Sequence, residues 1–138
     1  MTRIWYLLIC IAVVFIALAG CSGNKEAVTV GLGETLTIGV GQTARITGED
    51  MTVTFNGVIG DSRCPQNVTC VWEGVASSKT TIIYQGKEYT IVLNSRGLTE
   101  EAKEIFINYT LTYSLNPYPI EDKEIASKDY RLTMAITK

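Results

Sequence analysis

The chain has 138 residues, no histidine and a formal net charge of −2, with 12 Lys and Arg against 14 Asp and Glu. This length predicts a single domain. The mixed, mildly acidic charge argues against nucleic-acid binding, which requires clustered Lys and Arg. The lack of histidine excludes a Ser-His-Asp or Cys-His catalytic arrangement.

Residues 1–20 have the layout of a secretory signal peptide, with one positive charge at Arg3 and a continuous apolar run over residues 4–19. A membrane-spanning helix needs at least about 17 apolar residues, so a retained anchor is the rival interpretation. The run ends in LAGC at residues 18–21. This ending resembles the lipobox of prokaryotic lipoproteins, in which the leader is cut before a cysteine that carries a diacylglycerol.

The lipobox resemblance implies an extracytoplasmic lipoprotein whose acylated Cys21, with fatty acids such as palmitate, anchors it to the cell membrane or to an outer membrane. Anchoring is durable once two chains are present, because each buried methylene contributes about 0.8 kcal/mol. We expect residues 21–32 to form the lipidated N-terminus and tether. Residues 33–138 are then the folded domain.

The first predicted strands are Thr35–Val40 and Thr43–Thr47, two β-rich stretches separated by a tight turn at Gly41-Gln42. The next is Met51–Phe55, where apolar and polar residues alternate with a period of two. That period is typical of a half-buried strand in an antiparallel sheet.

The segment DSRCPQNVTCVWEG at residues 61–74 holds Cys64 and Cys70. With Cys10 in the leader and Cys21 acylated, these two remain as one pair, and in an exported protein such a pair predicts a disulfide. Their spacing fits neither a zinc site nor a CxxC redox motif. Trp72 lies two residues after Cys70, so on a strand it would face the same side and pack against the sulfurs.

After this segment, Ser78–Tyr84 and Glu88–Leu93 predict a hairpin whose loop, residues 85–87, has its glycine in the left-handed region. Leu98–Glu104, with the sequence LTEEAKE, predicts a short surface helix because Thr99 can cap it and acids occupy its first turn.

Two further segments alternate with a period of two, Ile107–Leu115 and Tyr130–Ile136. The sequence NPYP at residues 116–119 should end the first of them, because proline cannot donate to a strand ladder. The fold class predicted is all-β, an antiparallel β-sandwich (Ig-like) or a partly open barrel with about seven strands and one disulfide.

The pattern DSRCP at residues 61–65, followed by Cys70-Val71-Trp72 and Gly74, resembles a motif of uncharacterised prokaryotic exported proteins and lipoproteins. The resemblance covers roughly residues 33–138 and implies no established activity. Glu73 departs from the pattern, where a small residue is expected, and adds a charge beside the tryptophan.

These observations predict a cell-envelope lipoprotein that acts as a binding or structural module, with no enzyme activity, cofactor or metal. Besides the membrane, its expected partner is an envelope protein or a glycan, and not nucleic acid. Loops on a rigid sandwich are frequent recognition sites. The candidate binding loop consists of Asp61, Arg63, Gln66, Asn67, Trp72 and Glu73.

Two alternatives remain open. The protein could inhibit an extracytoplasmic hydrolase by presenting the loop between Cys64 and Cys70, as preorganised loops favour. Less favoured is an enzyme that uses the carboxylates of Asp61 and Glu73. The sequons at Asn67 and Asn108 are of consequence only if the host glycosylates exported proteins.

Overall fold

The computed structural model describes residues 27–96 and 102–138. The leader, Cys21 and residues 98–101 of the predicted helix lie outside the described residues. No helix within the described ranges is long and apolar enough to cross a membrane.

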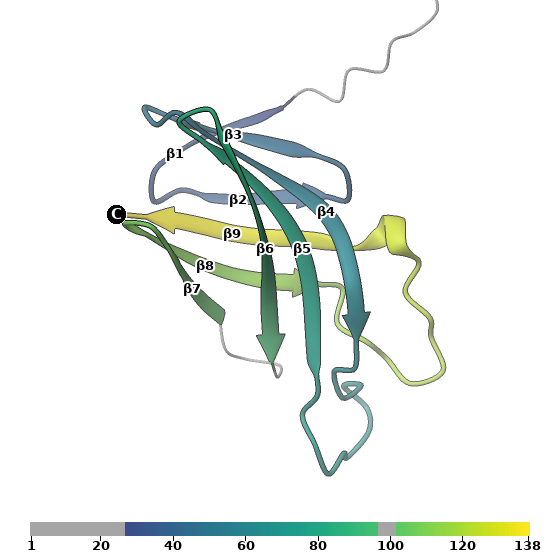
Figure 1. Cartoon of the computed structure of the whole chain (residues 1–138). Helices are drawn as coiled ribbons and strands as arrows, with labels where there is room; N and C mark the ends of the chain where they lie inside the picture. Colours follow the sequence, from purple (N-terminus) through teal and green to yellow (C-terminus); the bar gives the residue numbers. More distant parts are fainter. Residues whose placement is uncertain (1–26, 97–101) are drawn as a thin grey trace, which may run out of the picture.

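The described chain folds into two β-sheets that pack face to face (Figure 1). Its strands are β1 (Val28–Gly31), β2 (Thr35–Gly39), β3 (Thr43–Thr47), β4 (Met51–Asp61), β5 (Val75–Tyr84), β6 (Lys87–Arg96), β7 (Ala102–Phe106), β8 (Tyr109–Asn116) and β9 (Arg131–Thr137). A one-turn 3₁₀ helix, Ser127–Asp129, precedes β9. One sheet has the order β1-β3-β4-β5-β6 and the other β2-β9-β8-β7. The predicted all-β sandwich is therefore confirmed, with nine strands rather than about seven.

The core lies between the sheets and is built from the alternating segments that the sequence indicates. On β8 and β9 the apolar residues face inward in register, with Leu111 opposite Ile136 and Leu115 opposite Leu132. On β4, Val53 and Phe55 are fully buried, whereas Thr52 and Thr54 between them point outward. Because side chains alternate along a strand, each strand gives one face to the core and the other to solvent.

Three local predictions need correction. Ala102–Phe106 forms β7, where a helix over Leu98–Glu104 was expected, because these residues pair with β8 and tertiary pairing overrides a weak helix propensity. Ile107 is not on the long strand but in the turn before it, with a φ of 56°. The sandwich also begins before residue 33, since β1 pairs in parallel with β3.

The hairpin between β5 and β6 has the predicted position and a tighter loop than expected. Gln85 and Gly86 form a two-residue turn with φ values of 50° and 74°, so both lie in the left-handed region. This combination is that of a type I′ turn, whose twist matches the twist of the paired strands.

Thr80 on β5 points into the core, and its hydroxyl has no hydrogen-bond partner among the described residues. We expect Thr80→Val to raise the free energy of unfolding by about 1 kcal/mol, because valine has a similar shape and removes an unpaired buried hydroxyl. Chemical denaturation measures the change. Thr81→Val is the control, since the Thr81 hydroxyl donates to Asn56 and its loss should not stabilise. If Thr80→Val and Thr81→Val changed the free energy of unfolding equally, the assignment of Thr80 as the unpaired buried hydroxyl would be contradicted.

β4 is longer than predicted and extends, with β5, beyond the four-stranded sheet (Figure 1). In the five-stranded sheet, Val28 of β1 pairs with Ala44 of β3, and Ala44 pairs with Val53 of β4. Val53 lies eight positions before Asp61, the last residue of β4. At about 3.3 Å per residue, roughly 25 Å of β4 separate the level of Val28 from Asp61. The loop that follows β4 thus projects from the end of the sandwich remote from the start of β1.

Candidate functional site: the stapled loop

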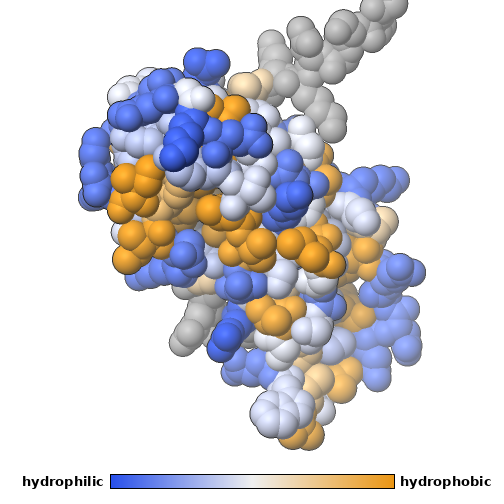
Figure 2. Space-filling model, viewed as in Figure 1, coloured by the Kyte–Doolittle hydropathy of each residue, from blue (hydrophilic) through white to orange (hydrophobic). Residues whose placement is uncertain are grey.

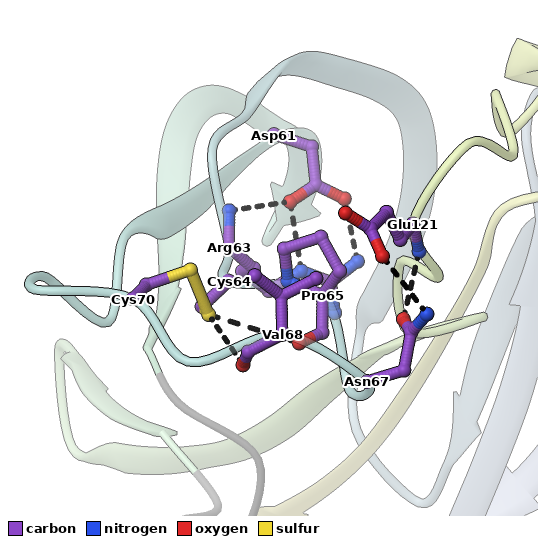
Figure 3. Close-up of a disulfide and its surroundings, with 8 residues drawn as sticks. All are labelled: Asp61, Arg63, Cys64, Pro65, Asn67, Val68, Cys70 and Glu121. Carbon is purple, nitrogen blue, oxygen red and sulfur yellow. Dashed lines mark hydrogen bonds and ion pairs between the residues drawn. A yellow bond between two sulfur atoms is a disulfide. The ribbon is translucent and has the colours of Figure 1, made fainter.

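Residues 62–74 connect β4 to β5 and are called here the stapled loop, because the predicted disulfide between Cys64 and Cys70 closes part of it (Figure 3). The two Cα atoms lie 5.9 Å apart. The Cys64 sulfur packs 3.4 Å from the Val68 carbonyl oxygen inside the ring. The staple therefore holds a compact turn at the end of the sandwich.

Arg63 fastens the base of this loop through a buried ion pair with Asp61, although both residues were predicted to belong to a contact surface. The Arg63 side chain is 1% exposed. Its Nε donates to Asp61 Oδ1 at 2.8 Å and its Nη2 to Asp61 Oδ2 at 2.6 Å. A two-bond arrangement of this kind matches the guanidinium fork to the carboxylate and fixes both groups.

The same guanidinium joins the loop to the other sheet. Arg63 Nη1 donates to the carbonyl of Leu115, the penultimate residue of β8, at 2.7 Å, and Nη2 donates to the carbonyl of Pro117 at 3.0 Å. The charged group also lies 4.8 Å from the centre of the Tyr118 ring. Arg63 is thus an internal clamp between β4 and the end of β8, and its predicted role as an exposed binding residue is wrong.

The ionisation of Asp61 follows from these contacts. Burial alone would raise the pKa of Asp61, but the hydrogen bonds and charge of Arg63, with a further bond from Tyr130, lower it overall. The Tyr130 hydroxyl donates to Asp61 Oδ2 at 3.1 Å. Burial and the negative charge of Asp61 raise the pKa of Tyr130, so this hydroxyl stays protonated and keeps its bond.

This lowered pKa predicts an acid-sensitive clamp. The carboxyl of Asp61 has an ordinary pKa of 3.8 and a lower one in the folded protein, so its stabilising contribution is present above pH 3.8 and is lost as the pH falls through the folded-state pKa. We expect the difference in unfolding free energy between the wild type and Asp61→Asn to shrink over this acid range. Urea denaturation at several pH values measures it, and a difference that does not change with pH would contradict the prediction.

Two polar residues of the loop dock it onto the connection between β8 and β9. The Asn67 side-chain oxygen accepts from the Glu121 backbone N–H at 2.9 Å (Figure 3). The Gln66 backbone N–H donates to the Pro119 carbonyl at 3.1 Å. The side chains of Asn67 and Glu121 also contact each other, with Nδ2 3.4 Å from Oε2. Asn67 is therefore exposed yet engaged in holding the loop.

The return of the loop into β5 is equally constrained. The Cys64 backbone N–H donates to the Glu73 carbonyl at 2.9 Å, and the Ser62 N–H donates to the Val75 carbonyl at 2.9 Å. Gly74 has a φ of 68°, and a Cβ there would lie 1.8 Å from the Ser62 carbonyl oxygen. Only glycine fits this position, so the two arms of the loop are locked together at its base.

The tip of the stapled loop, Val71 and Trp72, presents two large apolar side chains that the described residues leave uncovered. Val71 is 90% exposed and Trp72 is 82% exposed. The expectation that Trp72 packs against the sulfurs is therefore wrong, because residues 71–72 do not continue a strand and the side chain turns away from the domain. Figure 2, viewed as in Figure 1, shows the stapled loop projecting at the bottom of the described domain, with apolar (orange) atoms at its end.

Two separate hollows flank the loop. One, of about 350 Å³, lies between β4 and the β8–β9 connection and is lined by Asp61, Lys123 and Tyr130, among others. The other, of about 420 Å³, lies beside the tip and is lined by Trp72, Glu73 and Arg96, among others. Asp61 and Glu73 thus line different hollows, and the carboxylate of Asp61 is already engaged by Arg63 and Tyr130. This arrangement does not favour a catalytic pair.

The structure divides the predicted site residues into two groups. Asp61, Arg63 and Asn67 brace the loop, whereas Trp72 and Glu73 lie at its exposed end. Gln66 is exposed, and its backbone takes part in docking. The sequence analysis did not include Val71 and Arg96 among the candidate residues. For Val71 a signal was available, because the sequence VWE places two large apolar residues beside a charged one.

Within the described ranges, no group of three or more Asp, Glu or Cys could hold a metal.

The chain matches no protein-family model. It has no significant match among curated proteins or among solved structures. The fold and the proposed function therefore rest on the chain's own residues, and the resemblance of the DSRCP segment to exported proteins stays a prediction.

Proposed function

We propose that this protein is a lipoprotein of the cell envelope, anchored by acylated Cys21, that binds a partner through the tip of its stapled loop. The observation that carries the proposal is the exposure of Val71 and Trp72, at 90% and 82%. A folded domain gains stability by burying such side chains, and tryptophan is enriched among residues that dominate binding energy. Their exposure on a braced loop favours recognition.

The bracing supports the proposal because binding is stronger when the contact groups are already ordered. The disulfide, the clamp at Arg63 and the locked base at Gly74 restrict the loop before any partner arrives. A preorganised loop loses less conformational entropy on binding. No catalytic step belongs to this proposal.

The direction of the loop also fits a tethered module. Cys21 is seven positions before Val28, which allows at most about 25 Å between the lipid and β1. The stapled loop lies at the remote end of β4 (Figure 1). An anchored sandwich can therefore keep β1 near the membrane and direct the tip away from it.

Crosslinking in the native cell, followed by mass spectrometry, tests the proposal. We expect Trp72→Ala to reduce recovery of the partner about 30-fold, as removal of a binding hot spot of roughly 2 kcal/mol does, with an unchanged melting temperature. The control is Ile105→Ala on β7, since Ile105 is 76% exposed and far along the chain from the loop. Equal recovery with wild type and Trp72→Ala would refute the role of the tip.

A second candidate, inhibition of an extracytoplasmic hydrolase, is favoured by the shape of the loop, which projects as a stapled convex element (Figure 1). An inhibitor should block one enzyme of a protease and glycosidase panel and should itself stay uncut. A panel without any inhibition would count against this candidate and leave the binding module in place.

A further inference from the structure

The hollow beside the tip is a shallow depression that is widely open to solvent. Its volume of about 420 Å³ lies in the range of small-ligand sites. Its walls come from the loop, from the first residue of β5 and from the last residue of β6. The lining residues are Val71, Trp72, Glu73, Gly74, Val75 and Arg96.

The two charged residues of the hollow are available to a ligand. The ion pairs among the described residues are Asp61 with Arg63 and Glu49 with Lys138, so Glu73 and Arg96 are unpaired there. A carboxylate only accepts hydrogen bonds, and a guanidinium only donates them. The hollow therefore offers an acceptor, a forked donor and an exposed aromatic face within one small volume.

This combination matches the chemistry of a sugar ring. The face of the indole is electronegative, so it attracts the weakly positive C–H groups on the flat side of a pyranose ring. Each sugar hydroxyl both donates and accepts, so Glu73 and Arg96 can each bind one. Purely apolar or purely anionic ligands would use only part of this set.

The extent of the surface favours a glycan over a protein partner. A standard protein interface buries about 800 Å² on each side and uses roughly 20–30 residues. The tip offers two apolar side chains with charged residues next to them. A chain of sugar rings needs only a narrow platform of this kind.

We infer that the ligand of the stapled loop is a saccharide chain, with one ring stacked on Trp72 and neighbouring hydroxyls bound by Glu73 and Arg96. The inference rests on the proposed function and names the partner class for the same tip. The locked backbone around Glu73 and Gly74 holds this platform in place before the sugar binds.

Tryptophan fluorescence reports this binding directly, because the chain has two tryptophans, Trp5 and Trp72. In the full-length chain carrying Trp5→Phe, the emission comes from Trp72 alone. We expect a saturable blue shift with at least one of three soluble probes, which are oligomers of N-acetylglucosamine, of glucose and of a uronic acid. No shift with any of them would overturn the inference.

Variants then identify the contacts, with affinity measured by calorimetry. We expect Trp72→Ala to abolish measurable binding, Trp72→Phe to retain part of it, and Glu73→Gln and Arg96→Gln each to weaken it about tenfold. Ile105→Ala should bind like the wild type. Unchanged affinity in Trp72→Ala would overturn the inference even if a sugar binds elsewhere.

The crosslinking experiment separates failure of this inference from failure of the proposed function. A crosslinked protein that is lost in Trp72→Ala, with no saccharide binding, would overturn the glycan and keep the binding module. If Trp72→Ala reduced neither the crosslinking of a protein nor the binding of a saccharide, both the glycan inference and the binding module would be overturned.

Discussion

Replacing Arg63 with alanine is expected to lower the free energy of unfolding by about 3–5 kcal/mol, the largest single effect at the loop. The change removes a guanidinium whose side chain is 1% exposed. It leaves the partly buried carboxylate of Asp61 without its charged partner. It also leaves the carbonyls of Leu115 and Pro117 without the donors that now satisfy them.

Urea denaturation of two further variants distinguishes the clamp from a general effect of removing an arginine. Arg45→Ala on β3 is the matched control, because Arg45 is exposed on the five-stranded sheet from which the stapled loop projects. Its loss should change the free energy of unfolding by less than about 0.5 kcal/mol. Arg63→Lys keeps the charge and should restore only part of the stability, since an ammonium cannot reproduce the planar fork. A loss for Arg63→Ala no larger than that for Arg45→Ala would contradict the clamp.

Replacing both Cys64 and Cys70 with serine is expected to cost about 2.4 kcal/mol, the entropy of closing a seven-residue loop in the unfolded chain at 25 °C. This is a substantial part of the roughly 5–15 kcal/mol that stabilises a domain. The fold should survive, because Arg63 and Gly74 fasten the base of the loop independently of the sulfurs.

Thermal unfolding with and without reductant checks this prediction. Reductant should lower the melting temperature of the wild type toward that of the double serine variant, and should leave the variant unchanged. The thiol count gives an independent measure, since the oxidised pair does not react with thiol reagents until it is reduced. A wild type that is insensitive to reductant and already shows two free thiols at these positions would refute the staple.

The DSRCP motif thus acquires a structural meaning. Asp61 and Arg63 form the clamp, Cys64 is half of the staple, and the exposed apolar residues of the proposed binding tip, Val71 and Trp72, come after it. Most of what makes the segment distinctive in sequence serves to hold the tip, and the tip itself is two residues long.

The sequence by itself determined the strands with a clear apolar alternation and the staple. Side chains alternate along any extended chain, so the patterns in Met51–Phe55 and Tyr130–Ile136 identify one buried face without knowledge of the partner strand. The disulfide followed from counting cysteines, with Cys10 assigned to the predicted leader and Cys21 to the predicted lipid. Both inferences depend on local pattern or composition and on no distant contact.

The tertiary structure alone decided which polar residues are buried and which apolar ones are exposed. Arg63 is buried because carbonyls more than fifty positions later in the chain satisfy its donors, and no local pattern announces them. Ala102–Phe106, expected in part to be helical, became an edge strand because β8 offered a partner. Trp72 is exposed because the locked base of the loop directs it outward, and burial of a loop residue depends on where the rest of the fold leaves space.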